Sequence, residues 1–302
     1  MERSHASLRI ATPFGHIAAI DVGPEDDGGR PPIVFVHGVP LNSAHWQSII
    51  ARLSPRWRCF APDLLGLGAT DPREGVSPDF PTQAKMILSC LDALEIERFH
   101  LVGNDSGGAI AQILACMAPK RIASLTLTNC EVGGHAVPAA FAASHTMAKA
   151  GQLAQAMAAM CTDINLARST GGLGMAFENI DHITPALIDT YIAPLVGTAV
   201  RRRWLDAYVA AIRPEHLLAV QDHLSTLDMP TQLLWADSDV YFPMDDAWQL
   251  ARSITGFRRL VVAKGARLFF CEERPDWGAT QIESFLDQAG RELPERELTH
   301  DA

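Results

Sequence analysis

The feature that most constrains the fold of this chain is a repeated alternation of short apolar runs with stretches of helical periodicity. The apolar runs predict strands, whereas the stretches between them place apolar residues at helical spacing. The predicted strands cover residues 32–38, 58–64, 99–104, 124–130, 231–237 and 258–263, and the predicted helices cover residues 44–51, 82–94, 107–118, 245–253 and 275–290. This alternation predicts the α/β class, with a mostly parallel central sheet, helices on both faces and chemistry at the carboxyl ends of the strands. Before the first of these strands, residues 7–22 alternate well enough to predict an antiparallel hairpin.

One long segment interrupts this alternation. It is rich in Ala and Met and contains no convincing strand, and its helical stretches cover residues 139–161, 185–199, 201–212 and 214–225. We therefore predict an inserted helical cap at residues 132–225, on a core made of residues 1–131 and 226–302. The Met, Ala and Phe content of the cap favours a mostly apolar pocket for a small or medium organic molecule between cap and core.

The segment LVGNDSGGAIAQ, residues 101–112, runs from a predicted strand through a turn of small residues directly into a predicted helix. Such a turn strains the backbone of its central residue, Asp105, and the glycines at positions 103 and 107 let the strand and the helix pass closely. The N–H groups at the helix N-terminus favour an anion there. The pattern is typical of a nucleophile elbow, although Asn-Asp-Ser before a helix also occurs as a simple N-cap.

Charge and composition exclude several classes of protein. The net charge of −10 argues against a nucleic-acid partner, because phosphate binding needs clustered cations. The six cysteines are scattered without a CxxC pair, and we interpret them as reduced core thiols. We see no signal peptide and no run of about 18 apolar residues, so we expect a cytoplasmic protein that does not span a membrane. Since neither a phosphate or dinucleotide loop nor a metal-ligand spacing occurs, we expect a small-molecule substrate with no cofactor and no metal. The sequence is compatible with a homodimer but does not fix the oligomeric state.

Three further motifs accompany the elbow: HGVP at residues 37–40, DLLGLGATD at residues 63–71, and WADSD at residues 235–239 with Phe-Pro shortly after it. With them the chain resembles the α/β-hydrolase superfamily, and specifically its aspartate-nucleophile branch of epoxide hydrolases and haloalkane dehalogenases. The resemblance implies that Asp105 is the nucleophile and that the N–H groups of Val39 and Ser106 form an oxyanion hole. It also implies that Asp239 is the triad acid, with Glu131 at a position where some dehalogenases carry that acid.

The position that the resemblance assigns to the catalytic histidine holds a leucine. In that family the histidine stands just before an EERP helix start, which this chain has at residues 272–275. Counting back from the glutamates places Leu268 at the histidine position, and no histidine occurs between His223 and His300. The family's histidine activates the water that hydrolyses the ester on the aspartate, and leucine cannot accept a proton. Turnover by that route would stop at the covalent ester.

Four explanations stay open at this point. In the first explanation, Leu268 is an engineered change that traps the covalent intermediate. In the second, another residue supplies the base, and the candidates are His37, His135, His45 and the cap histidines. Alternatively, Asp105 acts as a general acid or base in an elimination, isomerisation or cyclisation. In the fourth explanation the chain is a ligand-binding protein descended from an enzyme.

The substrate is only partly constrained. Ser106 and Val39 stand where haloalkane dehalogenases usually carry halide-binding Trp and Asn, which puts halide binding in doubt. Tyr191 and Tyr208 are candidates for the tyrosine pair with which epoxide hydrolases protonate the epoxide, although packing is the more common role of a buried tyrosine. We expect an enzyme of the epoxide hydrolase or dehalogenase type that acts on a small to medium apolar molecule. A lyase, isomerase or cyclase, or a binding protein, is the alternative.

Overall fold

The structure, a computed structural model, describes residues 7–24, 28–289 and 297–299. Its strands are β1 (Ser7–Thr12), β2 (Gly15–Val22), β3 (Ile33–Val36), β4 (Cys59–Pro62), β5 (Asp71–Pro72), β6 (Phe99–Asn104), β7 (Ile122–Thr128), β8 (Thr231–Ala236), β9 (Phe257–Ala263) and β10 (Glu297–Thr299). They form one sheet in the order β1-β2-β4-β3-β6-β7-β8-β9-β10, and β5 pairs with β2 off this path. The pairs that involve β2 are antiparallel, and the pairs from β4 to β10 are parallel. The predicted hairpin and the predicted parallel sheet are confirmed.

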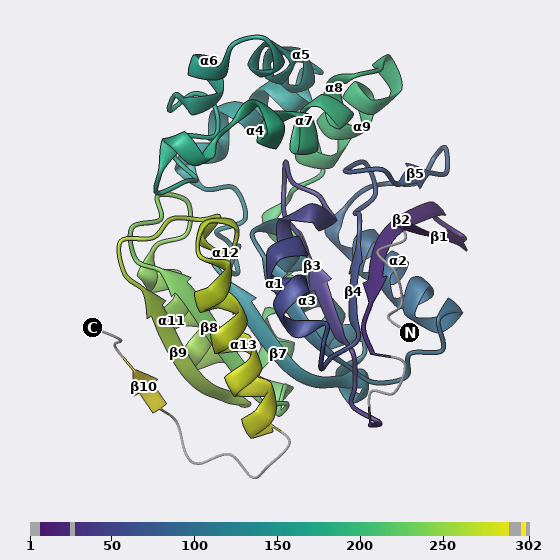
Figure 1. Cartoon of the computed structure of the whole chain (residues 1–302), viewed down its shortest axis with the longest axis vertical. Coiled ribbons are helices and arrows are strands. Elements are labelled where there is room, and N and C mark those ends of the chain that lie inside the picture. The colour runs from purple at the N-terminus through teal and green to yellow at the C-terminus, as the bar shows by residue number, and fades with distance from the viewer. Residues whose placement is uncertain (1–6, 25–27, 290–296, 300–302) are drawn as a thin grey trace.

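Helices cover both faces of this sheet (Figure 1). In the core they are η1 (Ser43–Trp46), α1 (Gln47–Leu53), α2 (Phe80–Ala93), α3 (Ser106–Met117), η2 (Pro119–Arg121), α11 (Met244–Ser253), α12 (Phe270–Glu273) and α13 (Pro275–Ala289). Successive strand residues point to opposite faces. In β3, Ile33 and Phe35 therefore pack in the apolar cluster that contains α1 and α13, whereas Val34 and Val36 pack in the cluster that contains α2, α3 and α11. Strands buried on both faces explain the continuous apolar runs of the sequence.

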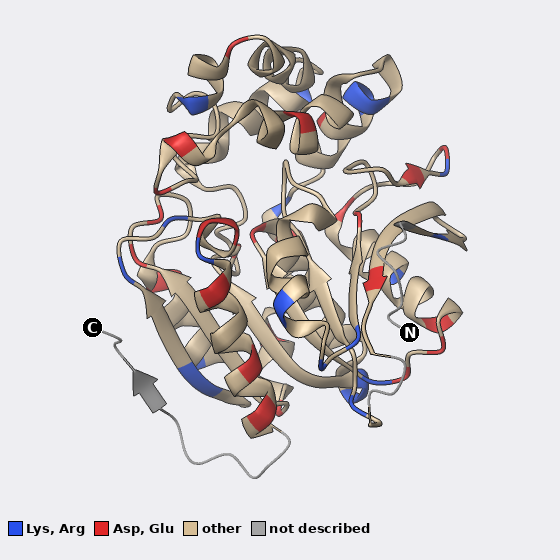
Figure 2. Cartoon of the chain, in the orientation of Figure 1, with Lys and Arg blue, Asp and Glu red and all other residues tan. Residues whose placement is uncertain are grey.

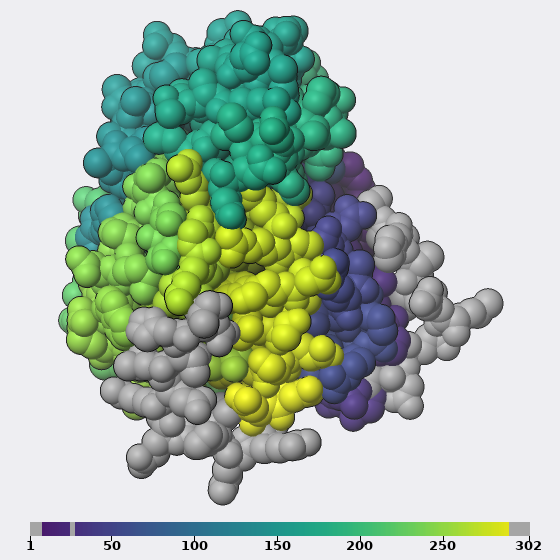
Figure 3. All heavy atoms as spheres, turned by 60° about the vertical axis from the view of Figure 1, so that its left-hand side comes forward, coloured from purple at the N-terminus to yellow at the C-terminus, as the bar shows by residue number. Residues whose placement is uncertain are grey.

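The segment between β7 and β8 is helical. Its helices are η3 (Ala139–Phe141), α4 (Ala142–Lys149), α5 (Leu153–Ala158), η4 (Ala159–Cys161), α6 (Ile164–Arg168), η5 (Ile180–His182), α7 (Pro185–Tyr191), α8 (Ala193–Val196), α9 (Ala199–Ala210), α10 (Pro214–Leu218) and η6 (Gln221–Thr226). We call these the cap helices. Side-chain N-caps help to start them, because Thr184 before α7 and Thr198 before α9 each accept a backbone N–H of the first turn. Figures 1 and 3 show α4 to α9 as a teal layer seated on one end of the core. The exact boundaries at residues 132 and 225 remain predictions.

Charged residues are distributed over both the core and the cap helices. Figure 2 shows acidic and basic residues interspersed along the visible face rather than gathered by sign. Several form ion pairs at the surface, for example Arg56 of the loop after α1 with Glu283 and Asp287 of α13. Each such exposed pair contributes about 1 kcal/mol or less to stability. Within the described part of the chain, no helix is long and apolar enough to cross a membrane.

Candidate active site

Asp105 occupies the sharp turn between β6 and α3. Its backbone has φ 53° and ψ −136°, a region that non-glycine residues seldom adopt. The turn is held from both sides, since the Asp105 N–H donates to the Asn129 carbonyl at 2.8 Å and the Gly108 N–H donates to the Asp105 carbonyl at 2.8 Å. Glycine is required at position 107, where a Cβ would lie 2.2 Å from the carbonyl oxygen of Val36. The strained turn that the glycine spacing predicted is present.

The carboxyl group of Asp105 is held by the backbone. Its Oδ2 accepts the N–H of Val39 at 2.7 Å, and the N–H of Ser106 also donates to this carboxyl group. These are the two N–H groups that the sequence assigned to an oxyanion hole. A Cβ on Gly38 would lie 2.1 Å from Oδ2, so only glycine at this position lets the carboxyl group approach Val39. The side chain of Asp105 therefore has one fixed orientation.

A cavity of about 420 Å³ lies over Asp105, between the strand ends and the cap helices. Its wall is mostly apolar and includes four methionines of the cap segment, namely Met147, Met157, Met160 and Met175. The polar side chains that line it are those of Asp105, Glu131, Ser144, Thr170 and Tyr241. Among the lining residues, which all belong to the described part of the chain, none is His, Lys or Arg. A cavity of this size and composition suits a small or medium apolar ligand.

Glu131 and Asp105 face this cavity as two neighbouring carboxyl groups. Glu131 is buried just beyond the end of β7, and its Oε2 has no hydrogen-bond partner. Burial, and next the charge of Asp105, raise the pKa of Glu131 well above its ordinary value. Burial also raises the pKa of Asp105 to about 7, against the opposing effect of the Ser106 and Val39 N–H groups. Near neutral pH the pair therefore retains a proton, which we place on Glu131.

Asp239 is buried and does not line the cavity, but its charge acts on Asp105. Its Oδ2 accepts the side-chain amide of Asn129 at 2.8 Å, and its Oδ1 accepts the N–H of Tyr241 at 2.9 Å. Burial raises the pKa of Asp239 to about 6. Asn129 is fixed in turn, because its Oδ1 accepts the N–H of Ala236 at 2.7 Å. An amide thus holds Asp239 where the resemblance implies a histidine.

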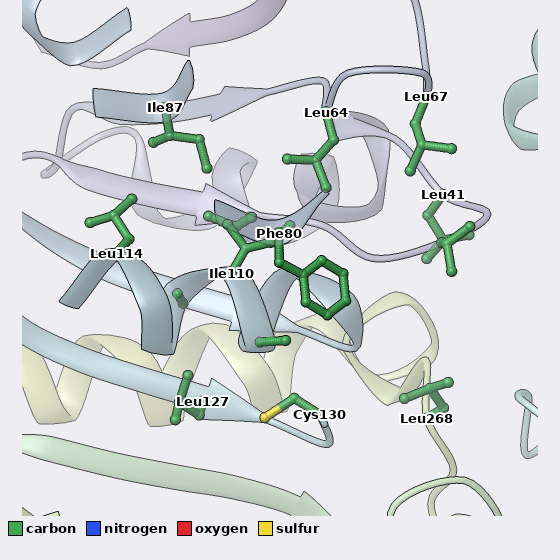
Figure 4. Close-up of a cluster of buried hydrophobic side chains, with 14 of the residues drawn as sticks. Leu41, Leu64, Leu67, Phe80, Ile87, Ile110, Leu114, Leu127, Cys130 and Leu268 are labelled. Atoms are coloured by element: carbon green, nitrogen blue, oxygen red, sulfur yellow. The ribbon is translucent and has the colours of Figure 1, made fainter. Parts of the chain in front are cut away.

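Leu268 lines the cavity on the loop that follows β9. Its side chain is buried and belongs to the cluster of buried hydrophobic side chains drawn in Figure 4, which also includes Leu41 and Cys130. Its carbonyl oxygen accepts the side-chain amide of Asn104 at 3.3 Å, which ties the loop to the end of β6. At this point the cavity wall is apolar and offers no proton acceptor.

Three residues that were expected near the reacting atoms lie outside the cavity wall. His37 is buried below it, where Nδ1 donates to the Gly38 carbonyl and Nε2 accepts the N–H of Leu64, and burial lowers its pKa to about 4. His135 instead pairs with Asp246 at 2.8 Å. Tyr191 points from α7 to Glu272, to which it donates at 2.8 Å. Each has a structural partner elsewhere, so the expectation that these three line the site is corrected.

Tyr208 does not line the cavity, but it contacts the elbow. It is buried in α9 and is absent from the cavity wall, but its hydroxyl lies 2.9 Å from Oγ of Ser106. That Oγ lies 3.5 Å from Oδ2 of Asp105. Tyr208 therefore contacts the elbow from the cap side and supports it without facing a ligand.

Tyr241 lines the cavity, although no sequence motif pointed to it. Burial, and then the charges of Asp239 and Asp105, raise its pKa to about 12, so its hydroxyl stays protonated and can donate a hydrogen bond. The available signal was its position two residues after Asp239, at the carboxyl end of a predicted strand.

Within the described residues, no group of three or more His, Cys, Asp or Glu side chains could hold a metal ion.

Comparison with known proteins agrees with this architecture. A family model for the alpha/beta hydrolase fold matches residues 31–274. An uncharacterised protein of Mycobacterium tuberculosis is 26% identical over 286 residues, which cover 93% of this chain and 81% of that protein. Haloalkane dehalogenase 2 of the same species is 35% identical over 104 residues, covering 34% of this chain and 36% of that protein. The crystal structure of a haloalkane dehalogenase from Bradyrhizobium elkani is similar with a TM-score of 0.77 at 19% identity, covering 94% of this chain and 98% of that chain.

Proposed function

Because this chain belongs to the alpha/beta hydrolase fold family, we propose that it is a cofactor-independent enzyme in which Asp105 removes a proton from a small or medium apolar molecule. The reaction is non-hydrolytic, of the lyase or isomerase type. The composition of the cavity carries this proposal. Asp105 and Glu131 line it together, and Leu268 lines it where a hydrolase of the aspartate-nucleophile branch needs a histidine.

The two carboxyl groups have complementary protonation states. A general base works best when its pKa lies near the working pH, which the pKa of Asp105, raised to about 7, satisfies. Burial, and next the charge of Asp105, raise the pKa of Glu131 well above its ordinary value, so Glu131 supplies the acid. Two carboxyl groups whose surroundings hold them in different protonation states form a working acid and base pair.

Hydrolysis would need a further base to activate water. Leu268 cannot act as that base, and the lone pairs of Asp239 already accept hydrogen bonds from Asn129 and Tyr241. Val39 and Ser106 supply the N–H groups that orient Asp105 toward the cavity, which keeps its geometry fixed during proton transfer. The described cavity wall thus supports one proton transfer between Asp105 and a ligand.

A second candidate function is alkylation of Asp105 in the manner of the aspartate-nucleophile branch. The strained turn and the backbone-held carboxyl group favour it, since a nucleophile needs the same fixed orientation. With no base to activate water, the ester on Asp105 would persist. This outcome differs from proton transfer in the mass of the protein.

The test is incubation of the full chain in D₂O with panels of ketones, epoxides and haloalkanes. Deuterium in the recovered compounds is read by NMR, and adducts are read by intact-protein mass. We expect deuterium incorporation without an adduct, lost in Asp105→Asn and retained in Asp222→Asn, a matched change at an exposed position. A persistent adduct on Asp105 without deuterium incorporation would establish the nucleophilic reaction instead. Tight binding with neither result would establish a binding protein.

A further inference from the structure

Two hydrogen-bond donors line the cavity together with Asp105. One is the hydroxyl of Tyr241, which has no hydrogen-bond partner within the described residues. The other is the protonated carboxyl group of Glu131, whose buried Oε2 is likewise without a partner. Both groups interact electrostatically with Asp105, which places them around the same part of the cavity. Two donors without partners in one cavity wall are available to bind an acceptor atom of a ligand.

The charge of the cavity restricts which ligand atom can accept hydrogen bonds from Tyr241 and Glu131. Asp105 and Glu131 are its ionisable carboxyl groups, and no cation of the described chain lines it. Arg267, next to Leu268, is not among the lining residues, and its guanidinium donates to the carbonyl oxygens of Gly174 and Met175 at 3.2 and 3.5 Å. A carboxylate or phosphate would be buried beside the two carboxyl groups with no cation in the cavity wall, which is unfavourable. The acceptor atom of the substrate is therefore uncharged.

We propose that the substrate is an uncharged lipophilic ketone that carries a proton on the carbon next to the carbonyl group. Tyr241 and Glu131 donate hydrogen bonds to the carbonyl oxygen, and Asp105 removes the neighbouring proton. This inference rests on the proposed function and adds the substrate class and the role of Tyr241. The apolar wall, with its four adaptable methionines, receives the hydrocarbon body of the ketone.

The reaction balances without a further reactant. The carboxylate of Asp105 takes the proton, and the electron pair of the broken C–H bond forms the carbon–carbon double bond of an enolate. The π electrons of the carbonyl group move to its oxygen, where the O–H groups of Tyr241 and Glu131 stabilise the charge. Asp105 then returns the proton to the same carbon or to a conjugated carbon. A carboxylate base, a phenol and a carboxylic acid kept neutral by apolar surroundings are an established combination for such a step.

The experiment measures deuterium exchange at the carbon next to the carbonyl group in cyclohexanone, α-tetralone and a linear methyl ketone. The matching tetralin carboxylic acid serves as the charged probe. We expect exchange above the buffer rate for at least one ketone, and no binding of the acid by calorimetry. Tyr241→Phe should slow exchange about 100-fold, as expected for loss of one donor to a developing oxyanion. Tyr191→Phe, the same change outside the cavity wall, should leave the rate unchanged.

Glu131 provides a second variant in case Tyr241→Phe does not fold. Glu131→Gln keeps a donor in place and should retain more exchange than Glu131→Leu. If Asp105-dependent exchange occurs only with epoxides or haloalkanes, the proposal that the substrate is a ketone is wrong, while the proposed function still holds. Equal rates in Tyr241→Phe and Tyr191→Phe would overturn the role of Tyr241. An Asp105 adduct without exchange, or no exchange with any compound, would overturn this inference and the proposed function together.

Discussion

Replacing Asp105 with asparagine is expected to stabilise the folded protein at alkaline pH. In the unfolded chain this carboxyl group ionises with its ordinary pKa of 3.8, whereas burial raises the folded value to about 7. Between these values the folded state keeps a proton that the unfolded state has lost, so the free energy of unfolding falls as pH rises. A pKa raised this far corresponds to ~4 kcal/mol, reached in full above pH 7.

The assay is urea denaturation of the wild type and Asp105→Asn at several pH values between 4 and 8.5. We expect nearly equal stability at about pH 4 and an advantage of ~4 kcal/mol for the variant at about pH 8.5. The amide oxygen of asparagine can still accept the N–H of Val39, which limits other changes. Asp222→Asn, at an exposed position, serves as the control. A difference between Asp105→Asn and wild type that does not vary with pH, or a variant less stable at pH 8.5, would refute the raised pKa.

Three further predictions concern the elbow. The rate of proton exchange should rise with pH and level off above about 7, because only ionised Asp105 accepts a proton; a rate that is flat from pH 5 to 9 would contradict this. Gly38→Ala should slow exchange about 100-fold by displacing the Asp105 carboxyl group, whereas Gly134→Ala, whose Cβ would meet no atom within 4 Å, should not. Tyr208→Phe should lower the free energy of unfolding by about 1 kcal/mol through loss of its bond to Ser106 and change the exchange rate less than tenfold, which denaturation and exchange measurements can check.

The elbow was predictable because its requirements are local. A strand, a turn with glycines at positions 103 and 107, and a helix follow one another in the chain, so the spacing alone identifies Asp105. The absence of a histidine at position 268 was likewise predictable, because counting back from the EERP helix start places Leu268 at the position that the resemblance assigns to the histidine. The same local patterns yielded the hairpin, the parallel sheet and the helical character of the cap segment.

The remaining site residues depend on long-range packing that local patterns do not encode. His135 pairs with Asp246 and Tyr191 with Glu272, partners that are 111 and 81 residues away in the chain. Tyr241 lines the cavity from the loop after β8, and its backbone N–H donates to Asp239 within that loop. Which side chain of a loop faces a ligand depends on such tertiary contacts, so the sequence selected cap tyrosines instead.

The most direct test of proton transfer by Asp105 is turnover of a reactive ligand in ¹⁸O-labelled water, followed by mass analysis of the peptide that contains Asp105. A nucleophilic aspartate whose ester is hydrolysed exchanges its carboxylate oxygen with solvent, whereas a general base does not. We expect an unlabelled Asp105 peptide after many turnovers, with solvent hydrogen incorporated into the recovered ligand. An Asp105 peptide that carries ¹⁸O, or one that remains alkylated, would contradict proton transfer as the function of this site.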